Sequence, residues 1–133
     1  MTFTFTEPQI NYYVEDVERA LRFYTEHFGF VETFRTPTQG EPEHVEVRLG
    51  SLVLGFATRE AAQRVHGLWA GPTGGGLRVE LVLWTDDVDA AHARLVANGV
   101  ASVIPPHDFL ETLRTAWLMD PDGNPVQIVM KKA

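Results

Sequence analysis

The chain has 133 residues, of which 44% are hydrophobic, and its formal net charge is −7 at neutral pH. This composition excludes a disordered chain, and the acidic balance argues against nucleic acid and anionic membranes as partners. The absence of cysteine excludes disulfides, thiolate metal sites and a cysteine nucleophile, and the absence of a signal peptide or a long apolar run makes a cytoplasmic protein the expectation.

The first half of the chain reads as a strand, a helix and three further strands. The first strand alternates in polarity, which places Gln9, Asn11 and Tyr13 on one of its faces. Asp16 is positioned as the N-cap of a helix that buries one apolar face. The expected elements are strands at residues 9–14, 30–35, 44–49 and 52–57 and a helix from residue 16 to about residue 27.

A connecting segment and a second series of elements follow. Residues 58–65 predict a short helix, and the glycine-rich residues 66–76 predict a linker. Asp87 is positioned as the N-cap of a further helix, which Asn98 and Gly99 end. Two prolines predict a loop at residues 105–111, and the sequence DPDGNP predicts a tight turn. Strands are expected at residues 80–84, 100–104, 112–119 and 126–130.

The second series of elements repeats the first. Tyr13–Glu18 aligns with Trp84–Asp89, and in the closing hairpins Leu54 aligns with Gln127. Two βαβββ modules predict an α+β fold in which each module forms a curved four-stranded sheet with its helix outside. The two sheets are expected to form an incomplete eight-stranded barrel around a shared cavity. A single domain is expected over residues 1–133, with module one at about 9–57, a connecting segment at about 58–76 and module two at about 77–130.

This ordered set of motifs resembles the vicinal-oxygen-chelate superfamily, which includes glyoxalase I, the bleomycin-resistance proteins and the extradiol dioxygenases. The motifs are the duplication, a strand ending V-x-D-V before a helix that carries Phe-Tyr, and the late DPDGNPVQIV. In catalytic members the resemblance implies a divalent metal held by the first and last strands of each module. The corresponding positions here are Gln9, Glu80, Gln127 and Leu54, with Gly55 as the near alternative to Leu54.

The fourth of these positions departs from the pattern, because a leucine cannot ligate a metal. Gln9, Glu80 and Gln127 would form an oxygen-only site suited to magnesium or manganese. The alternative is a metal-free polar spot in which these side chains bind each other or a ligand. Glu80 could also act as a general base if an apolar cavity raised its pKa, unless it is solvated or ion-paired.

Aromatic residues are the other candidates for a site. Tyr13 and Trp84 occupy equivalent positions in the repeat and would offer flat walls to a planar ligand, unless they serve ordinary packing. Trp69, in the linker, is expected to cover the pocket or to pack against a second subunit. The face of Trp117 and the role of His107 stay open. The full set of expected ligand-binding residues is Asn11, Tyr13, Leu54, Phe56, Trp69, Trp84 and Trp117.

Two functions are compatible with these features. The favoured one is a protein that binds a small aromatic or cationic molecule between the modules, without a catalytic metal or other cofactor. The alternative is a divalent-metal-dependent lyase, isomerase or dioxygenase of the glyoxalase type. The resemblance also implies a homodimer, and neither nucleic acid nor a membrane is expected as a partner.

Overall fold

The computed structural model describes residue 4 and residues 6–72, 76–77 and 79–133. The chain forms two compact units, Met1–Thr73 and Gly74–Ala133, each of which is described by itself. Their boundary falls in the predicted linker, of which residues 73–75 lie outside the described part. None of the helices in the described ranges is both long and apolar enough to cross a membrane.

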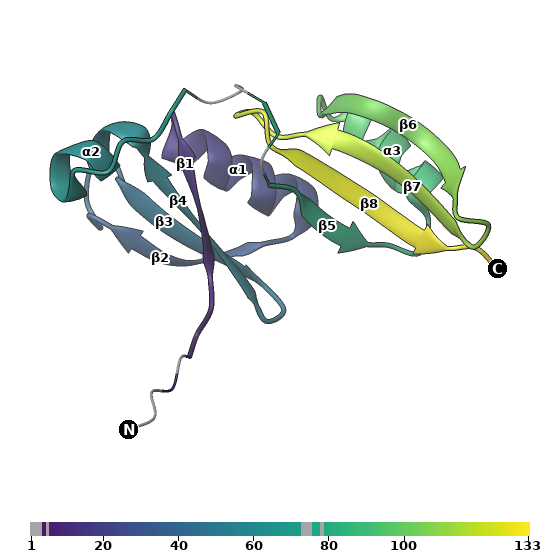
Figure 1. Cartoon of the computed structure of the whole chain (residues 1–133), viewed down its shortest axis with the longest axis horizontal. Coiled ribbons are helices and arrows are strands. Elements are labelled where there is room, and N and C mark those ends of the chain that lie inside the picture. The colour runs from purple at the N-terminus through teal and green to yellow at the C-terminus, as the bar shows by residue number, and fades with distance from the viewer. Residues whose placement is uncertain (1–3, 5, 73–75, 78) are drawn as a thin grey trace. The chain divides into compact units, whose positions relative to one another are not determined.

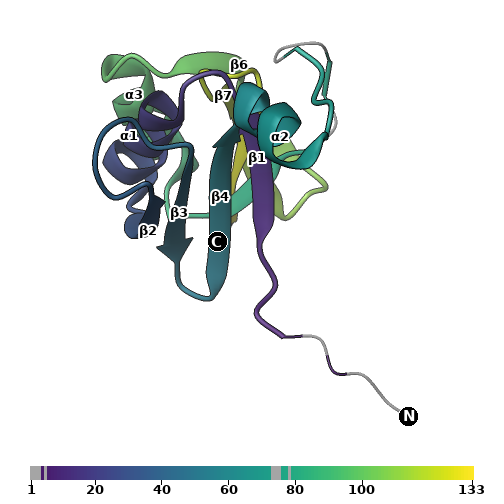
Figure 2. The same ribbon diagram turned by 90° about the vertical axis from the view of Figure 1, so that its left-hand side faces the viewer.

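Unit 1 is a four-stranded sheet with a helix on each side (Figures 1 and 2). The strand order is β1-β4-β3-β2, with β1 parallel to β4 and the other neighbours antiparallel. Helix α1 packs along one face, and the shorter α2 lies at the end of β4 and contacts β1. The elements are β1 (Ile10–Val14), α1 (Val17–Phe28), β2 (Val31–Thr36), β3 (His44–Leu49), β4 (Leu52–Thr58) and α2 (Arg59–His66).

Helix α1 begins and ends where the sequence predicts. The side chain of Asp16 accepts a hydrogen bond from the backbone N of Arg19 at 3.1 Å, which satisfies a free donor of the first turn. Gly29 ends the helix with a φ of 77°, a left-handed conformation that glycine adopts without strain. The apolar face between these ends buries Tyr24 completely and forms the core of unit 1.

Strand β4 places Leu54 and Phe56 on the other face of the sheet from the one that the sequence predicts. Leu54 and Phe56 were expected on the open face of the sheet, beside Tyr13. Both are buried instead, and the ring of Phe56 stacks on Tyr24 of α1 with centroids 5.2 Å apart. Since side chains alternate along a strand, the open face of β4 carries Gly55 and Ala57. The assignment of Leu54 and Phe56 to a ligand-binding face is therefore wrong.

Unit 2 has the same arrangement of strands and one helix. Its sheet has the order β5-β8-β7-β6, with β5 parallel to β8. Asp87 caps α3 by accepting a hydrogen bond from the backbone N of Ala90 at 3.0 Å, as predicted. The elements are β5 (Leu81–Trp84), α3 (Val88–Ala97), β6 (Ala101–Phe109), β7 (Leu113–Met119) and β8 (Pro125–Lys131). Two open four-stranded sheets with three helices, counted over the described residues, confirm the α+β fold.

Strand β6 is longer than the sequence predicts, because it continues through Pro105 and Pro106 to Phe109. A loop was expected there, since proline cannot donate a backbone hydrogen bond. Strand β6 lies at the edge of the sheet, where one side needs no partner, and its pairing with β7 shifts register between Ile104 and His107. Edge strands tolerate proline for this reason.

The turn between β7 and β8 is organised by the buried carboxylate of Asp120. It accepts hydrogen bonds from the backbone N of Asp122 at 2.9 Å and of Asn124 at 2.8 Å. Replacing Asp120 with alanine leaves these donors unpaired and should lower the free energy of unfolding by about 1–3 kcal/mol. Chemical denaturation measures this loss, and Asp120→Asn, which keeps one acceptor oxygen, should lose less. Equal stability of Asp120→Ala and the parent chain would contradict this role.

Candidate ligand-binding site

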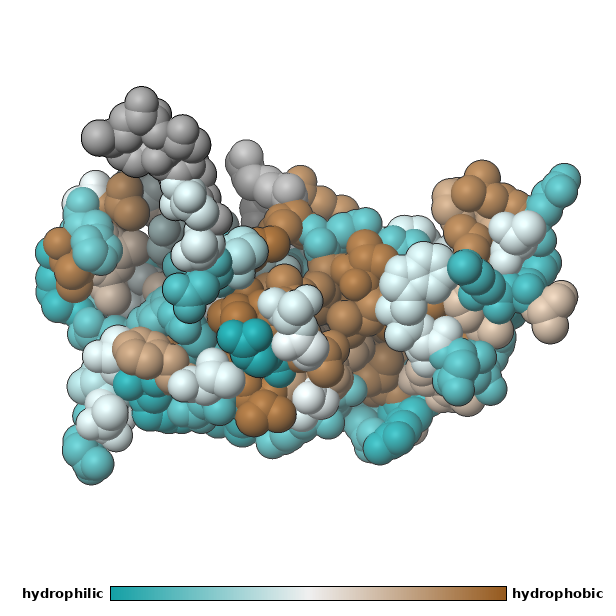
Figure 3. All heavy atoms as spheres, turned by 90° about the horizontal axis from the view of Figure 1, so that it is seen from below, coloured by the Kyte–Doolittle hydropathy of each residue, from teal (hydrophilic) through white to brown (hydrophobic). Residues whose placement is uncertain are grey.

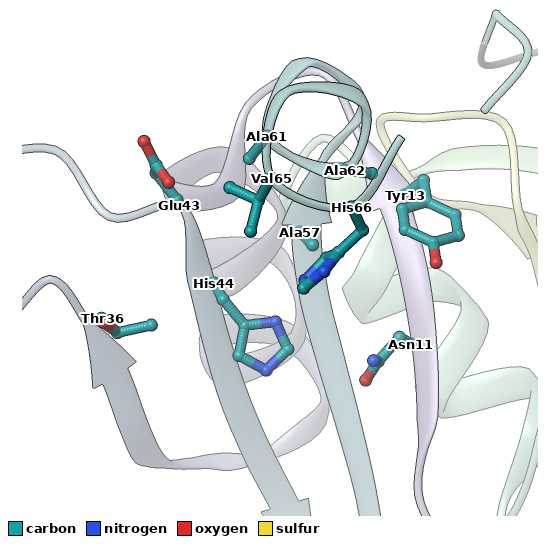
Figure 4. Close-up of a pocket in the computed structure, with 10 residues that line it drawn as sticks. All are labelled: Asn11, Tyr13, Thr36, Glu43, His44, Ala57, Ala61, Ala62, Val65 and His66. Carbon is teal, nitrogen blue, oxygen red and sulfur yellow. The ribbon is translucent and has the colours of Figure 1, made fainter. Parts of the chain in front are cut away.

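A pocket of about 370 Å³ lies in unit 1 between α2 and the sheet face that α1 leaves uncovered (Figure 4). Its apolar lining comes from Ala57 of β4 and from Ala61, Ala62 and Val65 of α2. A volume of this size accommodates a small organic molecule. The remaining lining residues are polar or aromatic, namely Asn11, Tyr13, Thr36, Glu43, His44 and His66.

Helix α2 is fixed over the sheet by its cap and by two ion pairs. The Thr58 hydroxyl accepts a hydrogen bond from a backbone N–H of the first turn at 3.0 Å. Arg59 pairs with Glu15, which follows β1, at 2.7 Å, and Arg64 pairs with Glu43, which precedes β3. Exposed ion pairs add little stability, whereas Ala61 and Ala62 are buried where the helix packs against the sheet.

A cluster of polar side chains crosses the open face of the sheet beside the pocket. The amide Nε2 of Gln9 donates to Oδ1 of Asn11 at 2.9 Å and to Oε2 of Glu46 at 3.2 Å. The same carboxylate oxygen lies 2.9 Å from Nε2 of His44. The hydrogen bond from His44, with a second one from Gln9, holds the pKa of the Glu46 carboxyl below its usual range. Glu46 is therefore an ionised acceptor at neutral pH.

Gly55 makes room for this cluster. A Cβ atom added at Gly55 would lie 2.1 Å from Oδ1 of Asn11 and 3.0 Å from Cε1 of His44. The two side chains thus lie directly over the glycine backbone, in the space that a larger residue would fill. A side chain at position 55 would therefore displace Asn11, and to a smaller extent His44, from their places in the cluster.

The pairing of the strands shows that Gly55 and Gln127 are equivalent positions. Gly55 lies opposite Asn11 of β1, and Gln127 lies opposite Val82 of β5, which the repeat aligns with Asn11. The alignment of Leu54 with Gln127 is therefore wrong by one residue. The near alternative at Gly55 is the one that the structure supports.

The shift arises from turns of different length. In unit 1, Leu49 pairs with Leu52 around the two residues of the turn, Gly50 and Ser51. In unit 2, Met119 pairs with Pro125 around the five residues 120–124. When the two units are aligned on their turn glycines, Gly50 and Gly123, the residues of β4 are consequently matched to the wrong residues of β8, with an error of one position.

The open face of unit 2 carries a related but different set of contacts. The indole N–H of Trp117 donates to Oε2 of Glu80 at 3.0 Å, and the ring of His107 stacks on Trp117 with centroids 6.0 Å apart. Gln127 donates to the hydroxyl of Thr115 at 2.9 Å. Trp117 thus lies on the same face of the sheet as Gln127. The sequence had left the face of Trp117 open. Because Glu80 is exposed, unit 2 does not provide the desolvation that a general base there would need.

Comparison with known proteins identifies the family. The sequence matches the Glyoxalase/Bleomycin resistance protein/Dioxygenase superfamily over residues 8–128. The chain belongs to this superfamily. A search of curated proteins gave no match.

Solved structures of the superfamily share the fold. A glyoxalase/bleomycin resistance protein/dioxygenase from Nocardioides superposes with a TM-score of 0.80 at 18% identity, covering 98% of this chain and 86% of that one. TnmS3, an antibiotic-binding protein from a Streptomyces species, has a TM-score of 0.70 at 28% identity and covers 98% and 100%. The fosfomycin resistance protein FosX from Mesorhizobium loti has a TM-score of 0.66 at 15% identity and covers 99% and 95%.

The positions at which the resemblance implies a metal carry a poor donor set in this chain. Gly55, at the fourth position, supplies no ligand atom. The others supply amide groups from Gln9 and Gln127 and one carboxylate from Glu80. Within the described ranges no three His, Cys, Asp or Glu side chains are grouped so that they could hold a metal ion. Catalytic sites usually have three good protein ligands, so these residues do not fit one.

The aromatic residues predicted to bind a ligand differ in whether they line the pocket and in how exposed they are. Tyr13 lines the pocket and is 41% exposed, and Trp84, at the equivalent place in unit 2, is 60% exposed. Trp69 is 79% exposed and does not line this pocket. Cover of the expected cavity between the modules and packing against a second subunit both stay predictions. Figure 3 shows apolar residues, in brown, exposed among polar ones on one face of the molecule.

The sequence did not point to His44, Glu46 and His66. His44 and Glu46 alternate along β3 in the sequence HVEVRL, so that a polar strand face was readable. The pocket itself depends on α2, which the sequence presented as part of a connecting segment. No pattern indicated that this helix returns over the sheet.

Proposed function

We propose that this chain binds a small, planar organic molecule in the pocket of unit 1 and does so without a catalytic metal. The observation that carries the proposal is the pocket itself, which combines an apolar wall from α2 with the polar residues of the sheet. Such a mixture is typical of small-molecule sites, where apolar contacts supply affinity and a few polar groups orient the ligand.

The chemistry of the lining favours ligands that are aromatic and carry hydrogen-bond donors. Tyr13 offers a ring for stacking, and Ala57 and Val65 offer apolar contacts. Glu46 and the overall charge of −7 favour donors and cations over anions. The likeness to TnmS3, described as an antibiotic-binding protein, supports sequestration of a small molecule rather than its conversion.

The absence of a donor at Gly55 supports a metal-free function. Metal-dependent chemistry of the glyoxalase type remains the alternative, and metal analysis of the purified protein separates the two. A stoichiometric divalent metal that is lost in Glu80→Ala would contradict the proposal. We expect no such metal.

Binding is tested with a matched pair of exposed helix valines. Val65 of α2 lines the pocket, whereas Val96 of α3 lies in unit 2. Val65→Glu should weaken binding of planar aromatic compounds by about tenfold or more, because it replaces an apolar wall by a charge, and Val96→Glu should leave it unchanged. Isothermal titration of an aromatic panel measures both. Equal effects of the two substitutions would show that the ligand binds elsewhere.

A further inference from the structure

We infer that Nδ1 of His44 is the hydrogen-bond acceptor of this pocket and selects ligands that present an N–H or O–H group. Glu46 acts as its positioning residue. The inference rests on the proposed function, since it names the group that the ligand meets in that same pocket. It assigns the ligand to the class of uncharged or cationic aromatic donors and excludes carboxylates and phosphates.

The first step is the proton on the imidazole. Nε2 of His44 lies 2.9 Å from Oε2 of Glu46, and an ionised carboxylate can only accept a hydrogen bond. A glutamate side chain with its ordinary pKa, about 4.3, is already ionised at neutral pH. Nε2 therefore carries the proton, and the lone pair of the neutral ring is on Nδ1.

The second step is the direction in which the ring is held. The edge of Phe34 contacts His44 with centroids 6.1 Å apart and an interplanar angle of 60°, and Gly55 leaves the space beneath Cε1. Glu46 fixes the remaining edge. The ring thus has one settled orientation, and an acceptor fixed before binding loses little entropy when a ligand arrives.

The third step is the free nitrogen. Nδ1 of His44 makes no hydrogen bond to another residue in the described part of the chain. Its ring lines the pocket, and Figure 4 shows it below the ring of His66, which descends from α2. A buried or half-buried acceptor without a partner is costly, so a ligand donor at this place would be favoured.

The surroundings of His44 decide the sign of the ligand's charge. Besides His44, the ionisable groups that line the same pocket are Glu43, which precedes β3, His66 from α2 and Tyr13 from β1. Glu46 contacts the ring of His44 itself. Arg64 of α2 is paired with Glu43. Arg64 offsets the charge of Glu43, so the carboxylate of Glu46 beside the imidazole is the charge that disfavours anions and favours hydrogen-bond donors.

The experiment compares 2-naphthol with 2-methoxynaphthalene, which has the same rings but no O–H donor. The parent chain should bind 2-naphthol about tenfold more tightly, as expected for one net hydrogen bond. His44→Phe keeps a ring against Phe34 but has no acceptor, so it should bind both compounds equally. His92→Phe, in α3 of unit 2, is the matched control, since His92 does not line the pocket, and it should keep the preference.

The tautomer of His44 provides a readout that needs no ligand. Nitrogen NMR of the imidazole should show the proton on Nε2 in the parent chain and a mixture of tautomers in Glu46→Gln. A proton on Nδ1 in the parent chain would overturn the inference. So would a preference for 2-naphthol that survives His44→Phe or disappears in His92→Phe.

Failure of the proposed function has a different signature. If both naphthalenes bind equally to the parent chain and Val65→Glu weakens both, the pocket is the binding site but the role proposed for His44 is wrong. If neither compound binds, or Val65→Glu weakens neither, the pocket is not the site, and the inference falls with the proposed function.

Discussion

Replacing Phe56 with alanine is expected to lower the free energy of unfolding by about 3–5 kcal/mol, the usual cost of removing a fully buried aromatic ring. Phe56 is completely buried, stacks on Tyr24 at 5.2 Å and meets the edge of Tyr12 at 6.0 Å. Its loss leaves a cavity where β4 packs against α1. Equilibrium denaturation with guanidinium chloride, followed by circular dichroism, measures the change.

Tyr13 is the matched control, because it lies in β1 next to Tyr12 but on the opposite, exposed face. Tyr13→Ala should change stability by less than about 1 kcal/mol, while it weakens ligand binding. The two substitutions therefore separate a core aromatic from a pocket aromatic. If Phe56→Ala left stability unchanged and abolished binding, Phe56 would belong to the ligand-facing side after all.

The helices and the order of the strands could be predicted because their signals are local. Asp16 and Asp87 each combine a capping side chain with an apolar face at helical spacing, and Gly29 and Gly99 supply the left-handed stops. The repetition of these signals also predicted two similar sheets. The two similar sheets are confirmed, since their strand orders, β1-β4-β3-β2 and β5-β8-β7-β6, follow the same pattern.

The faces of β4 could not be predicted by the same means. Its sequence, LVLGFAT, is apolar nearly throughout, so alternation gives no indication of which side is buried. The remaining guide was the turn glycine, and the turns of the two units differ in length. Leu54 and Phe56 were consequently assigned to the wrong face, and Gly55 was overlooked as the residue over which the cluster lies.

The pocket could not be predicted from local sequence signals, because it depends on contacts between residues that are distant in the sequence. Helix α2 lies over the sheet with Ala61 and Ala62 buried, and its arginines Arg59 and Arg64 pair with residues distant in sequence, Glu15 and Glu43. His44 and His66 line the same space only as a result of this packing. The incomplete barrel, the cavity between the modules and the homodimer concern relations beyond a single unit, and they stay predictions.

Replacing Gly55 with alanine is expected to disrupt the candidate site more than any change on its rim. The new Cβ would lie 2.1 Å from Oδ1 of Asn11 and 3.0 Å from Cε1 of His44, so both side chains must move. Such overpacking costs about 1–3 kcal/mol of stability. Displacement of His44 and Asn11 should also weaken binding of planar donors by about tenfold or more, because the oriented acceptor is lost. Denaturation and isothermal titration measure the two effects.

The direction of the stability change identifies its cause. Without a clash, alanine in a strand would be more stable than glycine by about 0.5–1 kcal/mol, because it loses less backbone entropy on folding. Asn11→Ala removes the closest atoms, so adding Gly55→Ala to that variant should cost much less than adding it to the parent chain. An equal cost in both backgrounds would show that Asn11 is not the obstacle. A stabilising Gly55→Ala in the parent chain would show that Gly55 is not required by the polar cluster, and that a side chain at this position, a metal ligand included, is compatible with the sheet.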